Sequence, residues 1–177
     1  QFQTPSEIFS DYAYFSSYSQ SWLEHSKEYV SKMIPRLGPN AHSQVIEIAS
    51  NDGYLLQYFQ QKGVPVLGVE PAGNVAAVAI EKGIPSTVAF FGVSTAEKLV
   101  GDGVKADLLL GNNVLAHVPD IKDFVAGMKI ILADAGTITM EFPHLLKLIM
   151  FNQFDTIYHE HFSYFSLHTV RDIFAAH

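Results

Sequence analysis

At 177 residues, the chain is long enough to form a compact domain with a buried core. Its 48% hydrophobic and 16% charged content is typical of a globular protein, and the absence of cysteine excludes a disulfide framework or a thiolate metal site within it. The formal net charge of −7 argues against nucleic acid or an anionic membrane surface as the main partner, and no apolar run is long enough to span a bilayer.

Residues 1–19 are rich in aromatic residues and serine, which is unusual for a free tail. We therefore expect an ordered arm that lies on another part of the protein and carries Phe9, Tyr12, Tyr14, Phe15 and Tyr18. From residue 21 to 37, apolar residues recur at helical spacing, and Gly38-Pro39 predicts the end of that helix. The arm and this helix are expected to form residues 1–40, ahead of a domain over residues 41–177.

From residue 45 onward, short apolar runs alternate with helical patterns. The expected strands cover residues 45–49, 64–69, 86–91, 106–110 and 137–142. The expected helices between them cover residues 54–61, 74–82, 94–100 and 121–132, and a capping box at residues 94–97 is expected to open the third. This alternation predicts right-handed β-α-β units and a parallel sheet with helices on both faces. Residues 143–151 and 167–176 are also expected to be helical, with a loop between them.

Polar residues follow the first two strands, at the sheet edge where open α/β sheets bind ligands. Glu70 closes the second strand, and a carboxylate there suits the ribose diol that NAD and S-adenosylmethionine (SAM) both carry. NAD also requires a glycine-rich loop beside its pyrophosphate, whereas residues 47–53 contain one glycine and two carboxylates, Glu47 and Asp52. Carboxylates repel a pyrophosphate but suit an ammonium and a sulfonium, so the loop favours SAM. The alternative is that Glu47 only caps a helix or pairs with a lysine.

Residues 47–53, 69–71, 111–118 and 158–163, together with the arm, resemble the sugar-nucleotide C-methyltransferases, which are class I SAM-dependent enzymes of deoxysugar biosynthesis. The resemblance implies a Rossmann-like doubly wound sheet, SAM with no metal in this stretch, and a small nucleotide-linked keto sugar as substrate in the cytoplasm. Such proteins also carry a cysteine-rich zinc module, a further domain and two more strands. None is visible here, so the resemblance implies a central domain with an incomplete sheet.

The residues expected to border the methyl donor lie at the ends of the first, second and fourth strands. They are Glu47, Ala49, Ser50, Asn51, Gly53, Glu70, Pro71, Asn112 and Asn113. Ala49 and Asn51 replace two glycines of the family's usual loop, and Ala49 is expected to disfavour a left-handed backbone. Asn112 and Asn113 have the alternative of forming only a turn, and Phe90 and Phe91 are either core residues or a wall for the adenine.

Tyr158, His159, Glu160 and His161 place four groups that can hold a proton next to one another. Methylation of a carbon beside a ketone needs a base that removes its proton and a donor to the enolate oxygen. By resemblance, the catalytic set is His161 as the base, with Glu160, Tyr158 and His117. Glu160 is expected to orient a histidine or hold a substrate group, Tyr158 and His117 to lie near the keto group, and His159 to be structural.

Several alternatives stay open from the sequence. The residues from His159 to His161 are also compatible with metal ligation or with a buried polar hinge before the last helix. For the whole chain, the alternatives are a methyltransferase of another small-molecule class, a nicotinamide-dependent oxidoreductase or epimerase, and a binding module without chemistry.

Overall fold

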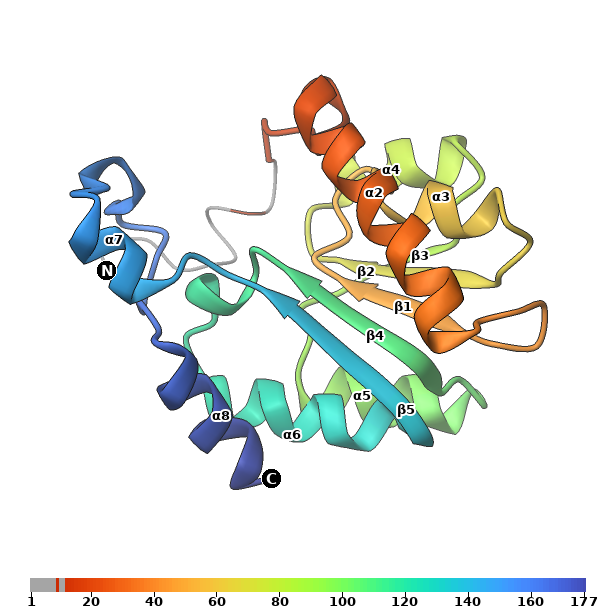
Figure 1. Cartoon of the computed structure of the whole chain (residues 1–177). Helices are drawn as coiled ribbons and strands as arrows, with labels where there is room; N and C mark the ends of the chain where they lie inside the picture. The colour runs from red at the N-terminus through yellow and green to blue at the C-terminus, as the bar shows by residue number, and fades with distance from the viewer. Residues whose placement is uncertain (1–8, 10–11) are drawn as a thin grey trace.

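A computed structural model describes Phe9 and residues 12–177, so arm residues 1–8 and 10–11 lie outside the described part. The fold is built on a parallel sheet of five strands in the order β3-β2-β1-β4-β5 (Figure 1). The strands are β1 (Val45–Ile48), β2 (Val66–Glu70), β3 (Ser86–Val88), β4 (Ala106–Asn112) and β5 (Leu132–Glu141). The expected doubly wound α/β sheet is confirmed, and its order reverses between β1 and β4, where such sheets bind ligands.

Helices cover both faces of the sheet (Figure 1). One face carries α2 (Gln20–Leu37), α3 (Leu56–Gln60) and α4 (Gly73–Glu81), and the other carries α5 (Val93–Gly101) and α6 (Ile121–Ile131). Strand residues alternate between the faces, so Leu108 packs with Val30 and Phe59, whereas its neighbour Leu109 packs with Phe124 and Met128. Within the described part of the chain, no helix is both long and apolar enough to cross a membrane.

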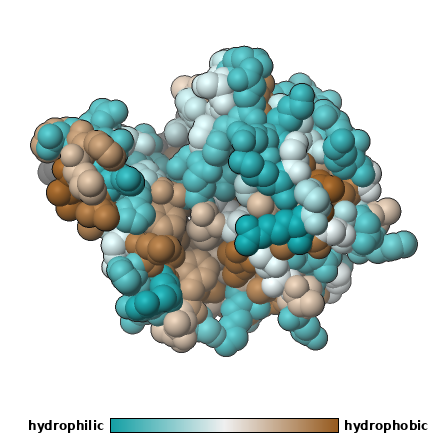
Figure 2. Space-filling view, viewed as in Figure 1, coloured by the Kyte–Doolittle hydropathy of each residue, from teal (hydrophilic) through white to brown (hydrophobic). Residues whose placement is uncertain are grey.

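The residues after β5 continue from the carboxyl end of the sheet. They form α7 (Leu145–Met150), η3 (Phe154–Thr156) and α8 (Leu167–Ala175), and two more 3-10 turns are η1 (Ser16–Tyr18) and η2 (Leu115–His117). The amide of Phe162 donates to the carbonyl of Ala116 at 2.8 Å, which fixes the loop before α8 against η2. Apolar side chains remain exposed along α7 and η3, including Ile149, Phe151 and Phe154, and Figure 2 shows apolar surface on this projecting segment.

The two largest differences from the predicted strand boundaries are at the start of β5 and at the end of β3. β5 begins at Leu132, directly after α6, rather than at residue 137. Ala106 pairs with Leu132 while Leu108 pairs with Thr137, and this irregular register absorbs the intervening residues into the strand. β3 ends at Val88 rather than at residue 91, because only three of its residues pair with β2.

The predicted capping box of α5 is wrong. The helix begins at Val93 after Gly92, and no side chain of its own segment caps it. Instead, the carboxylate of Asp123 on α6 accepts a hydrogen bond from the Val93 amide at 3.3 Å. The Thr95 hydroxyl donates to the carbonyl of Phe90 at 2.7 Å. A contact between two helices has therefore replaced the local cap that the spacing predicted.

Candidate active site

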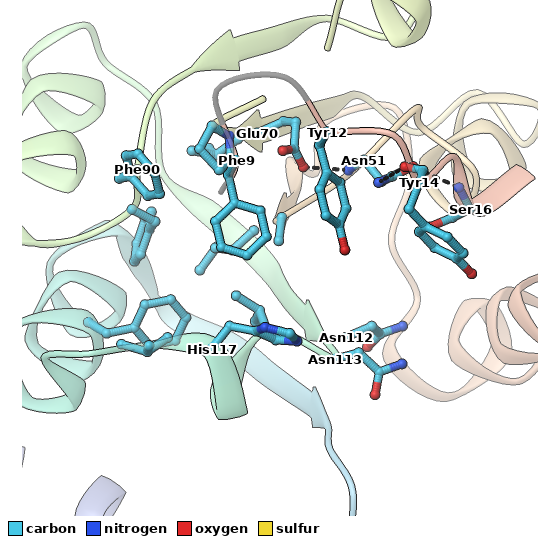
Figure 3. A pocket seen from close by; sticks show the side chains of 18 of the residues that line it. Phe9, Tyr12, Tyr14, Ser16, Asn51, Glu70, Phe90, Asn112, Asn113 and His117 are labelled. Atoms are coloured by element: carbon cyan, nitrogen blue, oxygen red, sulfur yellow. Dashed lines mark hydrogen bonds between the residues drawn. The ribbon is translucent and has the colours of Figure 1, made fainter. Parts of the chain in front are cut away.

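A cavity of about 880 Å³ opens beyond the carboxyl ends of β1, β2 and β4, and it is large enough for a nucleoside-sized ligand. Figure 3 shows Tyr12 and Glu70 on one side of it and His117 on the other. Six of the nine residues expected to border the donor line it: Ala49, Asn51, Glu70, Pro71, Asn112 and Asn113. Three others are buried outside the lining: Glu47, Ser50 and Gly53.

The loop after β1 has an unusual backbone. Ala49, Asn51 and Gly53 have φ angles of 55°, 49° and 76°. The expectation that Ala49 disfavours a left-handed conformation did not prevent one, although a side chain with a Cβ costs about 1–2 kcal/mol there. The Ala49 amide donates to the carbonyl of Val69 at 2.8 Å, and this bond to β2 helps to impose the strained turn.

Glu70 is a preorganised acceptor at the end of β2. Its side chain is only 4% exposed, and each carboxyl oxygen accepts one backbone N–H at 2.9 Å, from Asn51 and from Ala72. Burial raises the pKa of Glu70, and the hydrogen bonds from Ala72 and Asn51 oppose that shift. A carboxylate has about four lone-pair sites, so this one can still accept hydrogen bonds from both hydroxyls of a ribose.

Neither Glu47, which lies in β1, nor Asp52, in the loop after it, lines the cavity as the sequence had predicted. Glu47 is completely buried, and burial raises its pKa well above the usual range, an effect that the nearby Tyr54 hydroxyl opposes. Even so, no hydrogen bond of normal geometry reaches either Glu47 carboxyl oxygen from the described residues, so the lysine-pair alternative also fails for this residue. Asp52 instead pairs with Lys82 at 2.9 Å, away from the cavity lining.

The expected ordered arm is observed over residues 12–19. The Ser16 amide donates to the Asn51 side-chain oxygen at 2.8 Å, and the Asn51 side-chain nitrogen donates to the Tyr14 carbonyl at 3.1 Å. The Asn74 side chain likewise accepts from the Tyr12 amide at 3.2 Å and donates to its carbonyl at 2.9 Å. These bonds place Tyr12 and Tyr14 in the wall of the cavity (Figure 3).

The structure brings His161, Tyr158 and His117 together at the cavity. The ring centroid of His161 lies 4.1 Å from that of Tyr158 and 4.7 Å from that of His117. Nδ1 of His161 lies 2.9 Å from the carbonyl oxygen of Thr156, which can only accept a hydrogen bond. The neutral His161 ring therefore carries its proton on Nδ1 and presents Nε2 as a lone pair, which is the form that a general base requires.

His117 lies beside His161, and its lowered pKa keeps its imidazole uncharged near neutral pH. Its pKa is lowered to about 4, first by burial and then by the neighbouring His161, while a hydrogen bond with the backbone of Glu160 partly opposes the shift. Its Nδ1 is buried and has no hydrogen-bond partner among the described residues. A buried nitrogen without a partner on the wall of a cavity is suited to a hydrogen bond with a ligand.

Tyr12 is a site residue that sequence reasoning placed in the arm but did not assign to the site. Burial raises its pKa to about 12, and the charges of Glu160, Tyr158 and Glu70 add to the shift. Tyr12 therefore lies between the donor end and the proton-handling end of the cavity, with its hydroxyl protonated. Glu160 is close enough to Tyr12 and Tyr158 to raise both pKa values, although it does not line the cavity itself. The aromatic density of the arm was the only signal in the sequence.

The two phenylalanines after β3 have different positions. Both line the cavity, but Phe90 is 48% exposed, whereas Phe91 is half-buried and packs edge-on against Phe124, with ring centroids 5.6 Å apart. Neither residue is therefore only a core residue, and both are available as a wall for the adenine. Over Phe9 and residues 12–177, no group of three His, Asp or Glu side chains is arranged to hold a metal ion, so the metal alternative for His159 and His161 lacks its third ligand there.

Residues 22–177 match the protein family described as a methyltransferase domain. The chain belongs to this family. It is 38% identical to the C-methyltransferase NovU of Streptomyces niveus over 173 residues, which are 98% of this chain and 41% of NovU. It is 29% identical to a ubiquinone biosynthesis O-methyltransferase of Bartonella bacilliformis over 101 residues, 56% of this chain and 41% of that protein. The chain thus spans less than half the length of these curated relatives.

Solved structures confirm the fold. A SAM-dependent methyltransferase from Archaeoglobus fulgidus aligns with a TM-score of 0.69 at 16% identity, covering 87% of this chain and 67% of that one. A possible histamine N-methyltransferase from Thermotoga maritima aligns with a TM-score of 0.63 at 19% identity, covering 90% of this chain and 74% of that one. The expected methyltransferase fold and the expected likeness to C-methyltransferases are therefore confirmed.

Proposed function

We propose that this chain binds the methyl donor and supplies the base of a SAM-dependent C-methyltransferase, whose substrate is a nucleotide-linked keto-deoxysugar methylated beside its ketone. The observation that carries the proposal is the contact of His161 Nδ1 with the Thr156 carbonyl at 2.9 Å. This contact leaves Nε2 as the basic nitrogen of the neutral ring, and His161 lines the same cavity as Glu70. A donor site and a general base thus share one cavity.

The residues of the cavity suit SAM, which supplies an electrophilic methyl group and leaves as a neutral thioether. Glu70 keeps lone pairs for the two ribose hydroxyls. Phe90 offers an apolar wall to an adenine ring, and Asn112 and Asn113 add amide groups at the end of β4. Glu47 lies outside the lining, where burial raises its pKa, so it does not face the donor as a counter-ion.

His161 would begin the reaction by taking a proton from the carbon beside the ketone onto Nε2. The electron pair of the broken C–H bond forms the C=C bond of an enolate, and the former carbonyl oxygen takes the negative charge. Tyr12 and Tyr158 have raised pKa values, so both hydroxyls keep their protons and can donate hydrogen bonds to that oxygen. A positioned base of this kind contributes about 10²- to 10⁴-fold to the rate.

Kinship supports methylation of carbon, and the charge of the lining limits which part of a nucleotide-linked sugar can enter the cavity. NovU, the 38% identical relative, is a C-methyltransferase. The cavity lining contains Glu70, Asp120 and Asp123, and the described residues contribute no lysine or arginine to it. A nucleotide diphosphate therefore needs a binding site beyond this lining, while the uncharged keto sugar can enter it.

The test uses the full-length protein, methyl-labelled SAM and a panel of nucleotide-linked 4-keto-deoxysugars. We expect label on the carbon beside the ketone, and a rate that is lower by about 10²- to 10⁴-fold in His161→Gln. We also expect that the protein with S-adenosylhomocysteine in D₂O exchanges the substrate proton at that carbon, and that His161→Gln abolishes this exchange. His168→Gln, on the exposed side of α8, is the matched control and should behave as wild type.

Two outcomes contradict the proposal. Absence of label transfer together with absence of SAM binding in calorimetry would contradict the activity itself. Label transfer to a hydroxyl oxygen without any deuterium uptake would contradict the enolate step and favour O-methylation, which the same base can support.

A further inference from the structure

We propose that Asp52 and Lys82 are positioning residues that hold residues 12–17 of the aromatic arm in the wall of the cavity, so that donor affinity depends on an ion pair outside the cavity lining. This inference rests on the proposed function, because it concerns the same donor site. It assigns to Asp52 a role different from the direct stabilisation of a sulfonium that the sequence suggested.

The carboxylate of Asp52 joins three segments of the chain. It is 1% exposed and follows β1 in the strained loop, while Lys82 lies directly after α4. The ammonium of Lys82 is 2.9 Å from Asp52 Oδ2 and also donates to the Ser17 hydroxyl at 3.2 Å. From the arm, the Ser17 amide donates to Asp52 Oδ1 at 3.3 Å, and the Ser17 hydroxyl donates to Oδ2.

The arm depends on such side-chain contacts because it has little regular structure of its own. Residues 12–15 form no helix or strand, so their backbone groups lack a ladder of hydrogen bonds. Asn51, next to Asp52, binds the Ser16 amide and the Tyr14 carbonyl, and Asn74 binds both backbone groups of Tyr12. The Asp52–Lys82 pair is the charged member of this set of anchors, and a charge-assisted bond is about twice as strong as a neutral one.

The anchored residues are the ones that complete the cavity. Tyr12, Tyr14 and Ser16 line it, whereas Asp52 and Lys82 do not. Loss of Lys82 would leave the buried carboxylate of Asp52 without its counter-ion, which favours a rearrangement that exposes Asp52 and releases Ser17. The arm would then leave the cavity wall more often, and the donor would lose one wall of its site.

The test compares Lys82→Met with Lys82→Arg in the full-length protein, with Lys32→Met as the matched control. Lys32 makes a 2.7 Å ion pair with Glu28 on the exposed side of α2, so its loss removes a comparable charge far from the arm. Three quantities are measured: the Kd of S-adenosylhomocysteine by calorimetry, kcat and KM for SAM, and amide hydrogen exchange at Ser16 and Ser17.

For Lys82→Met, we expect the Kd of S-adenosylhomocysteine and the KM for SAM to rise about 10-fold or more. Exchange at the Ser16 and Ser17 amides should be faster by a similar factor, while the melting temperature stays close to that of Lys32→Met. Lys82→Arg should restore the Kd to within about threefold of wild type, since the charge is kept. Ser17→Ala removes only the hydroxyl contact from the arm side and should give a smaller change in the same direction.

The inference is overturned if Lys82→Met and Ser17→Ala both bind S-adenosylhomocysteine within about twofold of Lys32→Met. It is equally overturned if exchange at Ser16 and Ser17 matches wild type in both variants. If the wild-type protein binds no S-adenosylhomocysteine, the proposed function fails instead, and the exchange comparison alone decides whether the ion pair anchors the arm.

Discussion

Replacement of His117 by glutamine tests whether the folded protein keeps the imidazole of His117 uncharged. The wild-type imidazole is half-buried beside His161, and its buried Nδ1 has no hydrogen-bond partner among the residues that the structure describes. Glutamine keeps a polar side chain of similar reach but cannot take up a proton near neutral pH. We therefore expect His117→Gln to make the stability of the protein less sensitive to acid.

The magnitude follows from the depressed pKa of His117. Burial lowers this pKa from 6.5 to about 4, so between these values the unfolded chain binds a proton that the folded chain excludes. The free energy of unfolding therefore rises with pH in this window. The contribution of His117 is fully present above the unfolded pKa and is lost as the pH falls through the folded pKa. Between about pH 7 and pH 5, the loss from this one group is at most about 2 kcal/mol.

The assay is urea unfolding of wild type and His117→Gln at about pH 7 and about pH 5, followed by the fluorescence of Trp22, the single tryptophan. Wild type should lose about 2 kcal/mol more than the variant over this interval. Glu47 and Glu70 also have raised pKa values, but they are present in both proteins and cancel in the difference. Equal losses in the two proteins would refute the argument, because His117 would then be protonated as readily in the folded state as in the unfolded one.

Two further predictions concern the arm and the loop after β1. Tyr12→Phe should lower kcat by about 10²-fold with little change in the Kd of S-adenosylhomocysteine, because it removes only a hydrogen-bond donor to the enolate oxygen; an unchanged kcat in steady-state kinetics would remove Tyr12 from that role. Ala49→Gly should raise the free energy of unfolding by about 0.5–1 kcal/mol, since relief of the left-handed strain exceeds the entropy lost by glycine. Ala77→Gly, at an exposed position of α4, is the control and should instead lower it by about 1 kcal/mol in the same urea titration.

The sequence by itself determined the order of the elements and several of their ends, because these depend on interactions between near neighbours. Gly38 ends α2 with a φ of 66°, and Asp120 caps α6 through the amides of Lys122 and Asp123. Glu70 is the last residue of β2, as its place after an apolar run predicted. Periodicity and turn chemistry act over a few residues, and they can therefore be read without the fold.

Only the tertiary structure decided which polar side chains face the cavity. Glu47 lies in β1 and Asp52 in the loop that follows it, yet Glu47 is a buried acid without a hydrogen-bond partner in the described part of the chain, whereas Asp52 pairs with Lys82 and the arm. Tyr12 enters the site because Asn74, far away in the sequence, holds its backbone. The environment of a side chain depends on segments that the fold brings together, so burial and pKa shifts cannot be derived from neighbouring residue types alone.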